Sequence, residues 1–360
     1  MPNPIIKWKL NIHGKSDARL SNGIIIYYKS LKIEGKQKDF LNAVDSKTGD
    51  QIWEREIKWG VTSLSLSNEF VLFGQRSESL VGDSGYLLLL DKKTGMEKWS
   101  IDINKNNVYG ITTDGKNVYF GIGPTNNCIK AVDIDTSEEI WSCDTKDQIP
   151  ACLSIENNII SYSGWMSYFG ELYTIDTNTV KSKLLKFYVN SIGVNTISDN
   201  IIYFGIQSDD VDENDRKYYF NATDTKNGQD IWRYPTIGEV NSEPLFNNGL
   251  VYFVSYSSSK RQNYLYAVNA KTGKKIWDFD TEITGNVISP SVFRISENTV
   301  YLGASDNYLY AIDSITGEVK WKYNTKGNIS DVFIQNNIVY FIDGGYVSGY
   351  DNYTLYALDI

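Results

Sequence analysis

The sequence predicts an all-β fold, an eight-bladed β-propeller of four-stranded antiparallel blades that spans residues 1–360 as a single domain. Three observations predict it: one short motif recurs along the whole chain, its period lies in the forties, and the segments between its copies alternate like short strands. A period of this length with strand patterning is typical of a propeller blade.

The recurring motif is represented by AIDSITGEVKW, from Ala311 to Trp321. Its acidic position is filled eight times, by Asp45, Asp91, Asp133, Asp176, Asp224, Asn269, Asp313 and Asp359. Eight residues after the first seven of these stand Trp53, Trp99, Trp141, Leu184, Trp232, Trp277 and Trp321. An additional tryptophan, Trp8, stands near the start of the chain. We therefore expect the N-terminal strand to complete the last blade, which closes the ring without an open edge.

The strands of one unit follow in order from the inside of the ring to its outside. In the seventh unit we expect them at 288–295, 298–305, 307–314 and 318–325. Each segment is short, rich in β-branched and aromatic residues, and bounded by Asn, Gly, Ser or Asp. Thr316 and Gly317 lie in the tight turn between the last two strands, where glycine takes a positive φ without steric cost.

The motif tryptophan is large enough to fill the gap between two blades, and the small alanine two residues before the acidic position leaves room for it. A blade cannot bury both of its faces alone, so such a wedge is needed at each interface. We expect this structural docking role for Trp8, Trp53, Trp99, Trp141, Trp232, Trp277 and Trp321.

The pattern A-x-D-x-x-T-G-x-x-x-W resembles the tryptophan-docking motif of the pyrroloquinoline quinone (PQQ) repeat propellers. That superfamily includes eight-bladed quinoprotein dehydrogenases and the BamB-type outer-membrane assembly scaffold. The resemblance runs from Trp8 to Asp359, and seven of the eight units keep the tryptophan. The fourth unit, TIDTNTVKSKL, loses Ala, Gly and Trp together, which indicates either drift or remodelling for a partner.

Residues for catalysis are sparse. His13 is the only histidine, which excludes a histidine-rich zinc site, and no phosphate-binding glycine loop is present. In 209–216, Asp210, Asp212 and Asn214 fit the start of a calcium loop, but Asp215 replaces the glycine that the sharp turn needs, so a solvated acidic loop is expected. The resemblance implies that quinoprotein dehydrogenases carry an adjacent cysteine pair, which this chain lacks. We expect no catalytic residues, no metal and no cofactor.

Cysteine use and the start of the chain bear on the compartment. Cys128, Cys143 and Cys152 are three well-separated cysteines, which suit a reducing compartment, with a cross-strand Cys128–Cys143 bridge as the alternative. The first residues show no apolar signal segment, and no apolar run is long enough to cross a bilayer. We expect a cytoplasmic protein. The alternative is an exported protein whose signal peptide is absent from this chain.

The formal net charge of −9 argues against nucleic acid as a partner and is compatible with a basic protein. We expect a monomer.

The connections divide between the two faces of the disc. Turns between first and second strands lie on one face and are short, whereas loops between second and third strands lie on the other face and six of them are long. These are 29–39, 75–85, 163–171, 207–217, 255–263 and 343–352. Loops on a rigid scaffold are where binding residues usually lie.

The long loops supply the expected partner-binding residues. Aromatic anchors are Trp165, Tyr168, Phe169, Tyr346 and Tyr350, and acidic side chains that could steer a basic partner are Asp209, Asp210, Asp212, Glu213 and Asp215. The alternative is that the aromatic side chains only cover the channel or neighbouring blades.

Two classes of function remain. The first is a non-catalytic scaffold that binds a protein partner, in assembly or in neutralising a basic toxin as immunity proteins do. The second is a propeller whose channel binds a small ligand, a cation or a quinone and has enzymatic activity. The inner strands are rich in serine, with Glu243 and Asp331 as their only acids, which favours the scaffold.

Overall fold

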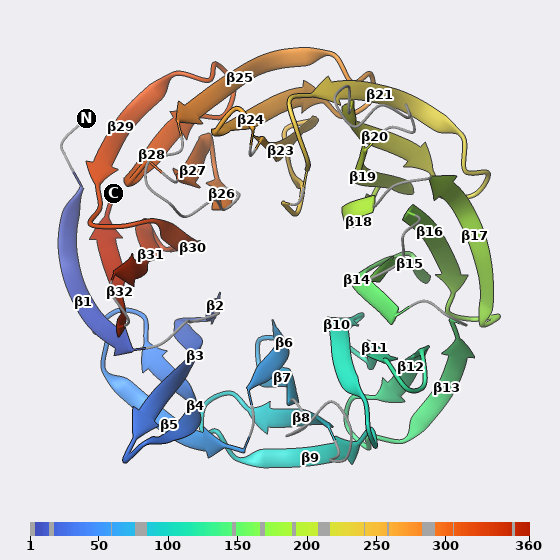
Figure 1. The fold of residues 1–360 in the computed structure, drawn as a ribbon, viewed down its shortest axis with the longest axis horizontal. Coiled ribbons are helices and arrows are strands. Elements are labelled where there is room, and N and C mark those ends of the chain that lie inside the picture. Colours follow the sequence, from blue (N-terminus) through green and yellow to red (C-terminus); the bar gives the residue numbers. More distant parts are fainter. Residues whose placement is uncertain are drawn as a thin grey trace.

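The structure of the protein is a computed structural model. It describes residues 4–13, 18–58, 60–75, 85–145, 149–165, 170–188, 192–207, 217–240, 242–257, 259–282, 292–304, 306–347 and 350–360. Its strands form eight four-stranded antiparallel sheets arranged as a ring (Figure 1). None of the described residues forms a helix long and apolar enough to cross a membrane.

Seven blades are meanders of consecutive strands, ordered from the centre of the ring to its circumference. The strands of blades 1 to 4 are β2 (Ala18–Ser21), β3 (Ile24–Ile33), β4 (Lys36–Asp45) and β5 (Gln51–Ile57); β6 (Val61–Leu66), β7 (Phe70–Gln75), β8 (Tyr86–Asp91) and β9 (Glu97–Asp102); β10 (Asn107–Thr113), β11 (Asn117–Gly123), β12 (Cys128–Asp133) and β13 (Glu139–Asp144); and β14 (Ile149–Glu156), β15 (Ile159–Trp165), β16 (Gly170–Asp176) and β17 (Lys181–Tyr188).

The strands of blades 5 to 7 are β18 (Ile192–Ser198), β19 (Ile201–Gln207), β20 (Tyr218–Asp224) and β21 (Asp230–Thr236); β22 (Leu245–Asn247), β23 (Leu250–Ser257), β24 (Gln262–Asn269) and β25 (Lys275–Glu282); and β26 (Val292–Ser296), β27 (Thr299–Gly303), β28 (Tyr308–Asp313) and β29 (Val319–Asn324). All four strands expected in the seventh unit are present, although residues 288–291 of the expected inner strand lie outside the described residues.

Blade 8 closes the ring with both ends of the chain. It contains β30 (Ile329–Gln335), β31 (Ile338–Val347), β32 (Tyr350–Asp359) and, outermost, the N-terminal β1 (Ile5–His13). Trp8 of β1 pairs with Ala357 of β32. This confirms the all-β fold, the eight blades and the closure by the N-terminal strand. His13, whose backbone pairs with Asn352, ends this strand.

The apolar cores lie between neighbouring blades. Successive side chains of a strand point to opposite faces of the sheet, so Ile25 and Ile26 of β3 enter different cores although both are fully buried. Ile25 belongs to the cluster that contains Tyr340 of blade 8, and Ile26 to the cluster that contains Phe73 of blade 2. Eight such clusters join consecutive blades around the described ring.

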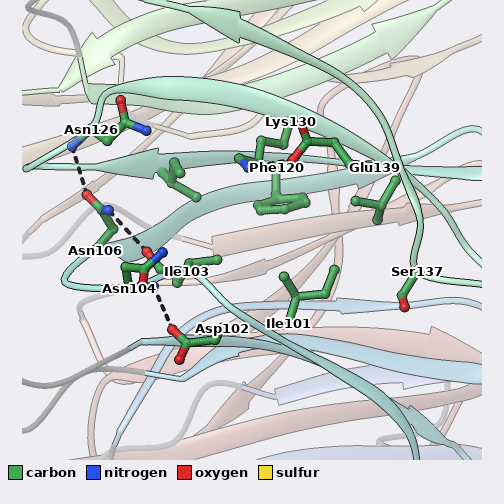
Figure 2. A pocket seen from close by; sticks show the side chains of 12 residues that line it. Ile101, Asp102, Ile103, Asn104, Asn106, Phe120, Asn126, Lys130, Ser137 and Glu139 are labelled. Carbon is green, nitrogen blue, oxygen red and sulfur yellow. Dashed lines mark hydrogen bonds and ion pairs between the residues drawn. The ribbon is translucent and has the colours of Figure 1, made fainter.

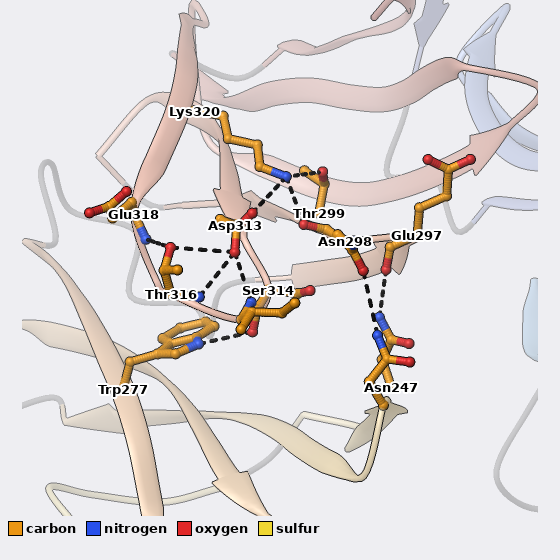
Figure 3. A network of polar contacts seen from close by, with 12 residues as sticks. Asn247, Trp277, Glu297, Asn298, Thr299, Asp313, Ser314, Thr316, Glu318 and Lys320 are labelled. Atoms are coloured by element: carbon orange, nitrogen blue, oxygen red, sulfur yellow. Dashed lines mark hydrogen bonds and ion pairs between the residues drawn. The ribbon is translucent and has the colours of Figure 1, made fainter.

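The motif tryptophans contact the following blade. The indole Nε1 of Trp277 donates to the carbonyl oxygen of Ser314 at 2.9 Å, as Figure 3 shows. A Cβ atom on Gly317 would lie 2.8 Å from the Trp277 ring, so the motif glycine leaves the space that the indole occupies. Equivalent hydrogen bonds of 2.8 to 3.0 Å to the residue after the acidic position are made by Trp8, Trp53, Trp99 and Trp232.

The residue two before the acidic position faces the tryptophan across the third and fourth strands of a blade. Ala311 pairs with Trp321, and Ala267 pairs with Trp277. Because cross-strand partners share one face of a sheet, the small alanine lies beside the large indole. The other pairs are Ala43–Trp53, Leu89–Trp99, Ala131–Trp141, Ala222–Trp232 and Ala357–Trp8.

Blade 4 departs from this register by one residue. Its β-bulge falls after Leu184, so Leu184 pairs with Tyr173 rather than with Thr174. Leu184 is 47% exposed, whereas Leu185 packs into the core between blades 4 and 5. A Cβ atom on Gly228 of blade 5 would lie 3.2 Å from Leu185 Cδ1. The spacing places Leu184 at the tryptophan position, but Leu185 occupies that place.

The alternative of a Cys128–Cys143 bridge is wrong. The two residues lie on paired strands, as expected, but Cys128 pairs with Asp144 and Cys143 with Ile129. Neighbouring register positions point to opposite faces, so Cys128 enters the core between blades 2 and 3 and Cys143 packs between blades 3 and 4. All three cysteines are free.

Candidate functional site

On the face that carries the turns between first and second strands, hydrogen bonds from these turns join several blades to their neighbours. The backbone N–H of Gly23 in blade 1 donates to Gln335 Oε1 of blade 8 at 2.8 Å. The backbone N–H of Asn200 in blade 5 donates to Glu156 Oε2 of blade 4 at 3.0 Å. These short turns therefore serve ring closure.

A buried lysine, Lys92, adds hydrogen bonds between turns on this same face. Lys92 is 1% exposed, and its ammonium donates to the carbonyl and hydroxyl oxygens of Ser21 at 3.1 Å and to the carbonyl oxygen of Ser67 at 3.0 Å. Burial lowers the pKa of Lys92. An ammonium has three N–H donors, and all three are used here. Lys92 therefore links the turns of blades 1 and 2 through hydrogen bonds.

On the opposite face, three of the expected long loops are largely extensions of the strands. Residues 29–39, 255–263 and 343–352 were expected to be loops, but in the structure they mainly lengthen β-hairpins. The strands of the β3–β4 hairpin stay paired out to Ile33 and Lys36, and those of β23–β24 out to Ser257 and Gln262. The β31–β32 pair continues to Val347 and Tyr350. The polar residues in these three segments are common in loops, but they also fit the alternation of a strand with one solvent-facing side. The sequence pattern alone therefore did not separate the two structures.

The lengthened hairpins of blades 1 and 8 are the longest. β3, β4, β31 and β32 contain 10 residues each, against 5 and 6 for β27 and β28 of blade 7. Blades 8 and 1 are consecutive, so the two hairpins belong to neighbouring blades (Figure 1). Strand pairing fixes the backbone of a hairpin, which makes it a rigid support for a binding surface.

Polar contacts tie the blade 1 hairpin to the outer strand of its own sheet. Lys29 Nζ lies 2.6 Å from Glu54 Oε2, and Lys38 Nζ lies 3.2 Å from a carboxylate oxygen of Glu56. The Tyr28 hydroxyl donates to Asp39 Oδ1 at 2.9 Å, and Asp39 is buried. The lengthened part of the hairpin is therefore braced.

Two carboxylates with restricted solvent access, the buried Asp343 and the half-buried Asp306, lie on the same face in blades 8 and 7. Asp343 of β31 is 4% exposed and accepts a hydrogen bond of 2.9 Å from the backbone N–H of Lys326. Asp306, before β28, accepts one of 2.5 Å from the Tyr310 hydroxyl. Burial raises the pKa of both carboxyl groups. Nothing in the sequence pattern distinguishes these two acids from solvated loop residues, so they were not among the expected site residues.

The aromatic residues expected to bind a partner do not lie together. Trp165 ends β15 in blade 4, whereas Tyr346 and Tyr350 lie in β31 and β32 of blade 8. Blades 4 and 8 are four positions apart in a ring of eight, so these residues lie on opposite sides of it (Figure 1). Tyr168 and Phe169 lie outside the described residues.

The five acidic residues expected to steer a partner, Asp209, Asp210, Asp212, Glu213 and Asp215, also lie outside the described residues. They stand between β19 and β20 of blade 5, the neighbour of blade 4. Their expected role therefore stays a prediction.

The described residues do not fit a quinone site with its calcium ion. They contain no group of three or more His, Cys, Asp or Glu side chains placed to hold a metal ion. Asp331, one of the two acids expected on the inner strands, accepts a hydrogen bond of 3.3 Å from the Ala18 backbone N–H and lies 4.0 Å from Arg19 Nη1. It joins blades 8 and 1. The adjacent cysteine pair implied for quinoprotein dehydrogenases is missing from the sequence.

A family comparison agrees with the repeat and the closed ring. The sequence model of the family described as outer membrane protein assembly factor BamB matches residues 37–177 and 193–359. The chain belongs to this BamB family. No curated protein matches the chain.

Solved structures resemble the BamB-family chain over nearly all of its length. The computationally designed Ika8 protein is 16% identical with a TM-score of 0.71, covering 97% of this chain and 99% of its own. BamB from Moraxella catarrhalis is 14% identical with a TM-score of 0.63, covering 99% and 100%. A europium-containing methanol dehydrogenase is 11% identical with a TM-score of 0.65, covering 99% and 93%. At these identities the likeness shows the fold alone.

Proposed function

We propose that this protein is a non-catalytic scaffold that binds a protein partner on the face bearing the lengthened hairpins. The observation that carries the proposal is the contrast between the two faces. On one face the short turns are engaged with neighbouring blades. On the other, blades 8 and 1 project adjacent hairpins of 10-residue strands that ring closure does not require.

Charge and membership of the BamB family support a protein ligand. The net charge of −9 favours a basic partner, which the acidic residues 209–215 would steer to the same face. A role in assembly has its precedent in the family description, and neutralisation of a basic toxin is the other role compatible with the charge. The cytoplasmic location and the monomeric state expected from the sequence stay predictions.

The enzymatic alternative has less support. A quinone or metal site needs converging ligands, and the described residues contain no group of three metal-ligating side chains. Its test is a titration with PQQ and calcium in which binding is monitored through the absorbance of the quinone. We expect no saturable change, and a saturable 1:1 change would contradict the non-catalytic proposal.

The direct test is affinity capture from the native lysate with three versions of the protein. The first is the intact chain. The second replaces Leu31–Lys38 by Asn-Gly, which closes the blade 1 hairpin next to the Ser30–Asp39 pair with a favoured two-residue turn. The third is Trp165→Ala/Tyr168→Ala/Phe169→Ala in blade 4. We expect one stoichiometric protein partner with the intact chain and its loss with at least one variant.

A matched control places substitutions on the turn face. Lys47 and Lys271 are exposed turn residues, and Lys47→Ala/Lys271→Ala should retain the partner. Cooperative unfolding should be kept by all versions. Loss of the partner only from the control variant, or no partner with the intact chain, would overturn the proposal.

A further inference from the structure

A pocket of about 110 Å³ opens between blades 2 and 3. Its apolar walls come from both blades and include Ile101 and Ile103 of blade 2 and Phe120, Ile122 and Val132 of blade 3. Polar groups surround these walls, as Figure 2 shows. An apolar floor with a few polar groups around it is the usual composition of a small-ligand site.

Three other blade interfaces, between blades 5 and 6, 6 and 7, and 7 and 8, have a pair of aromatic residues at the equivalent position. Ile101 stands two residues after the motif tryptophan, and Lys130 stands three residues before the acidic position of the next blade. At the blade 5–6 interface the equivalent residues are Tyr234 and Tyr266, whose ring centroids lie 5.4 Å apart at 64°. Aromatic side chains thus close that interface where blades 2 and 3 place an isoleucine and a lysine.

The same aromatic filling recurs at the next interface. Between blades 6 and 7 the equivalent residues are Phe279 and Tyr310, with ring centroids 5.1 Å apart at 66°. The Tyr310 hydroxyl donates to the Asp306 carboxylate. Between blades 6 and 7, the position equivalent to Lys130 is therefore occupied by a phenol ring whose hydroxyl donates to an oxygen acceptor.

Within blade 3, Phe120 lacks the ring that its counterparts contact. Phe253 of blade 6 stacks on Tyr266 with centroids 5.2 Å apart, and Phe341 of blade 8 stacks on Tyr356 at 4.8 Å. Phe120 makes no ring contact with another described residue, because Lys130 stands opposite it where the others have tyrosine.

The rim of the pocket can recognise a hydroxyl group. Lys130 Nζ lies 2.5 Å from Glu139 Oε2. On the other side, Asn106 Oδ1 accepts from the backbone N–H of Asn126 at 3.0 Å, and Asp102 Oδ1 accepts from the backbone N–H of Asn104 at 2.7 Å. Carboxylate oxygens accept from a phenol O–H, and an ammonium donates to its oxygen.

The geometry points to a binding site for a single phenol ring between blades 2 and 3, which takes the place of the tyrosine rings found between blades 5 and 6 and between blades 6 and 7. An enclosed apolar cavity of about 150 Å³ holds benzene, so a partly open pocket of about 110 Å³ is closer in size to one ring than to a fused pair. The site is independent of the proposed partner surface and does not require it.

The test is a titration of the full chain with p-cresol, the small-molecule analogue of the tyrosine side chain. Binding is monitored by NMR of the isoleucine methyl groups. We expect saturable shifts at Ile101, Ile103 and Ile122 with a Kd on the order of 1 mM. Ile295, in the core between blades 6 and 7, should not shift. Indole, a fused ring pair, should bind at least about 10-fold more weakly.

Two variants fill the pocket from opposite walls. Lys130→Tyr introduces the tyrosine that blades 6, 7 and 8 have at the equivalent position, and Ile101→Phe introduces the phenylalanine that blade 6 has there. Each should weaken p-cresol binding at least about 10-fold, and the second keeps the test valid where the first fails to fold. Lys93→Tyr, the same substitution at an exposed turn residue outside the pocket, should bind as the unaltered chain does.

A blocked tyrosine peptide separates the two sources of a phenol ring. Binding of both p-cresol and N-acetyl-Gly-Tyr-Gly-amide indicates that a protein side chain can enter, whereas binding of p-cresol alone indicates a free small phenol. The absence of saturable shifts at the pocket methyl groups, or equal binding by the filled variants, would overturn the site.

Discussion

Lys183 Nζ of blade 4 donates to the carbonyl oxygen of Lys226 in blade 5 at 2.8 Å. At five other interfaces an indole N–H makes the hydrogen bond to the corresponding turn. Leu185 of the same strand fills the space beside Gly228. In blade 4 the two contributions of one tryptophan, an apolar body and a hydrogen-bond donor, are thus divided between a leucine and a lysine.

The one-residue shift in blade 4 predicts that two neighbouring leucines contribute very differently to the free energy of unfolding. Leu185→Ala should lower the free energy of unfolding by about 2 kcal/mol, because it leaves a cavity between blades 4 and 5. Leu184→Ala should cost less than about 0.5 kcal/mol, because that side chain is exposed. Urea unfolding of both variants measures the difference. If Leu184→Ala costs more unfolding free energy than Leu185→Ala, then Leu184, and not Leu185, occupies the tryptophan position.

This pair shows where sequence reasoning ends. The period, the strand segments and the closure by β1 follow from the repeat, because each copy must bury the same faces against its neighbours. Moving a β-bulge from before Leu184 to after it leaves the spacing between units unchanged, so no count of residues reveals it. Likewise, polar residues in 29–39 satisfy both a loop and a strand, and only pairing decides between them.

The candidate sites were less predictable for a related reason. The pocket between blades 2 and 3 depends on Ile101 and Lys130, which lie in different blades and have no unusual local sequence. Comparing equivalent positions across the repeats would have drawn attention to it, since three interfaces place a pair of aromatic residues there. The placement of Trp165 and Tyr346 on opposite sides of the ring follows from blade order and was available from the sequence.

The contribution of a motif tryptophan to stability can be measured at Trp277. Trp277 is 7% exposed, and its indole contacts Gly317 and the Ser314 carbonyl oxygen. Trp277→Ala should cost about 3–5 kcal/mol of unfolding free energy, and Trp277→Phe about 1–2 kcal/mol, since it keeps an aromatic ring but loses the N–H donor. Denaturant unfolding measures both values.

The neighbouring residue provides the control. Ile276 is 47% exposed on the same strand, and Ile276→Ala should cost less than about 1 kcal/mol. If Trp277→Ala costs no more than Ile276→Ala, the expected docking role of the motif tryptophans is wrong.

Blade 4 carries backbone strain that a glycine should relieve. Val180 stands where most units have glycine and has a φ of 54°, in the left-handed region that β-branched residues avoid. Val180→Gly should therefore stabilise the protein by about 1 kcal/mol despite the greater flexibility of glycine in the unfolded chain. The shift of the thermal midpoint measures it. Lys181→Gly, one residue later in β17, should instead destabilise, and stabilisation by both would point away from backbone strain.

The acidic position of the motif predicts a loss of stability in acid. Backbone N–H groups of Thr316 and Ile315 donate to Asp313 Oδ1, and Lys320 Nζ lies 3.1 Å from Oδ2. The Thr316 hydrogen bond contributes most, and together these contacts hold the pKa of Asp313 at about 2, below its ordinary value of 3.8. Because the folded pKa is the lower one, the unfolded chain binds more protons between about pH 4 and pH 2, and stability falls as the pH drops through that window.

Asn269 shows that an amide can hold the same turn without titrating. Its Oδ1 accepts from the backbone N–H groups of Lys271 and Thr272 at 3.1 and 3.0 Å. Asp313→Asn should therefore keep the fold, cost less than about 1 kcal/mol at pH 7 through the lost Lys320 pair, and lose less stability than the unaltered chain on acidification. Asn269→Asp should add pH dependence. Urea midpoints at pH 7, 4 and 3 decide it, and identical acid dependence in all three proteins would show that the motif carboxylates do not set the acid stability.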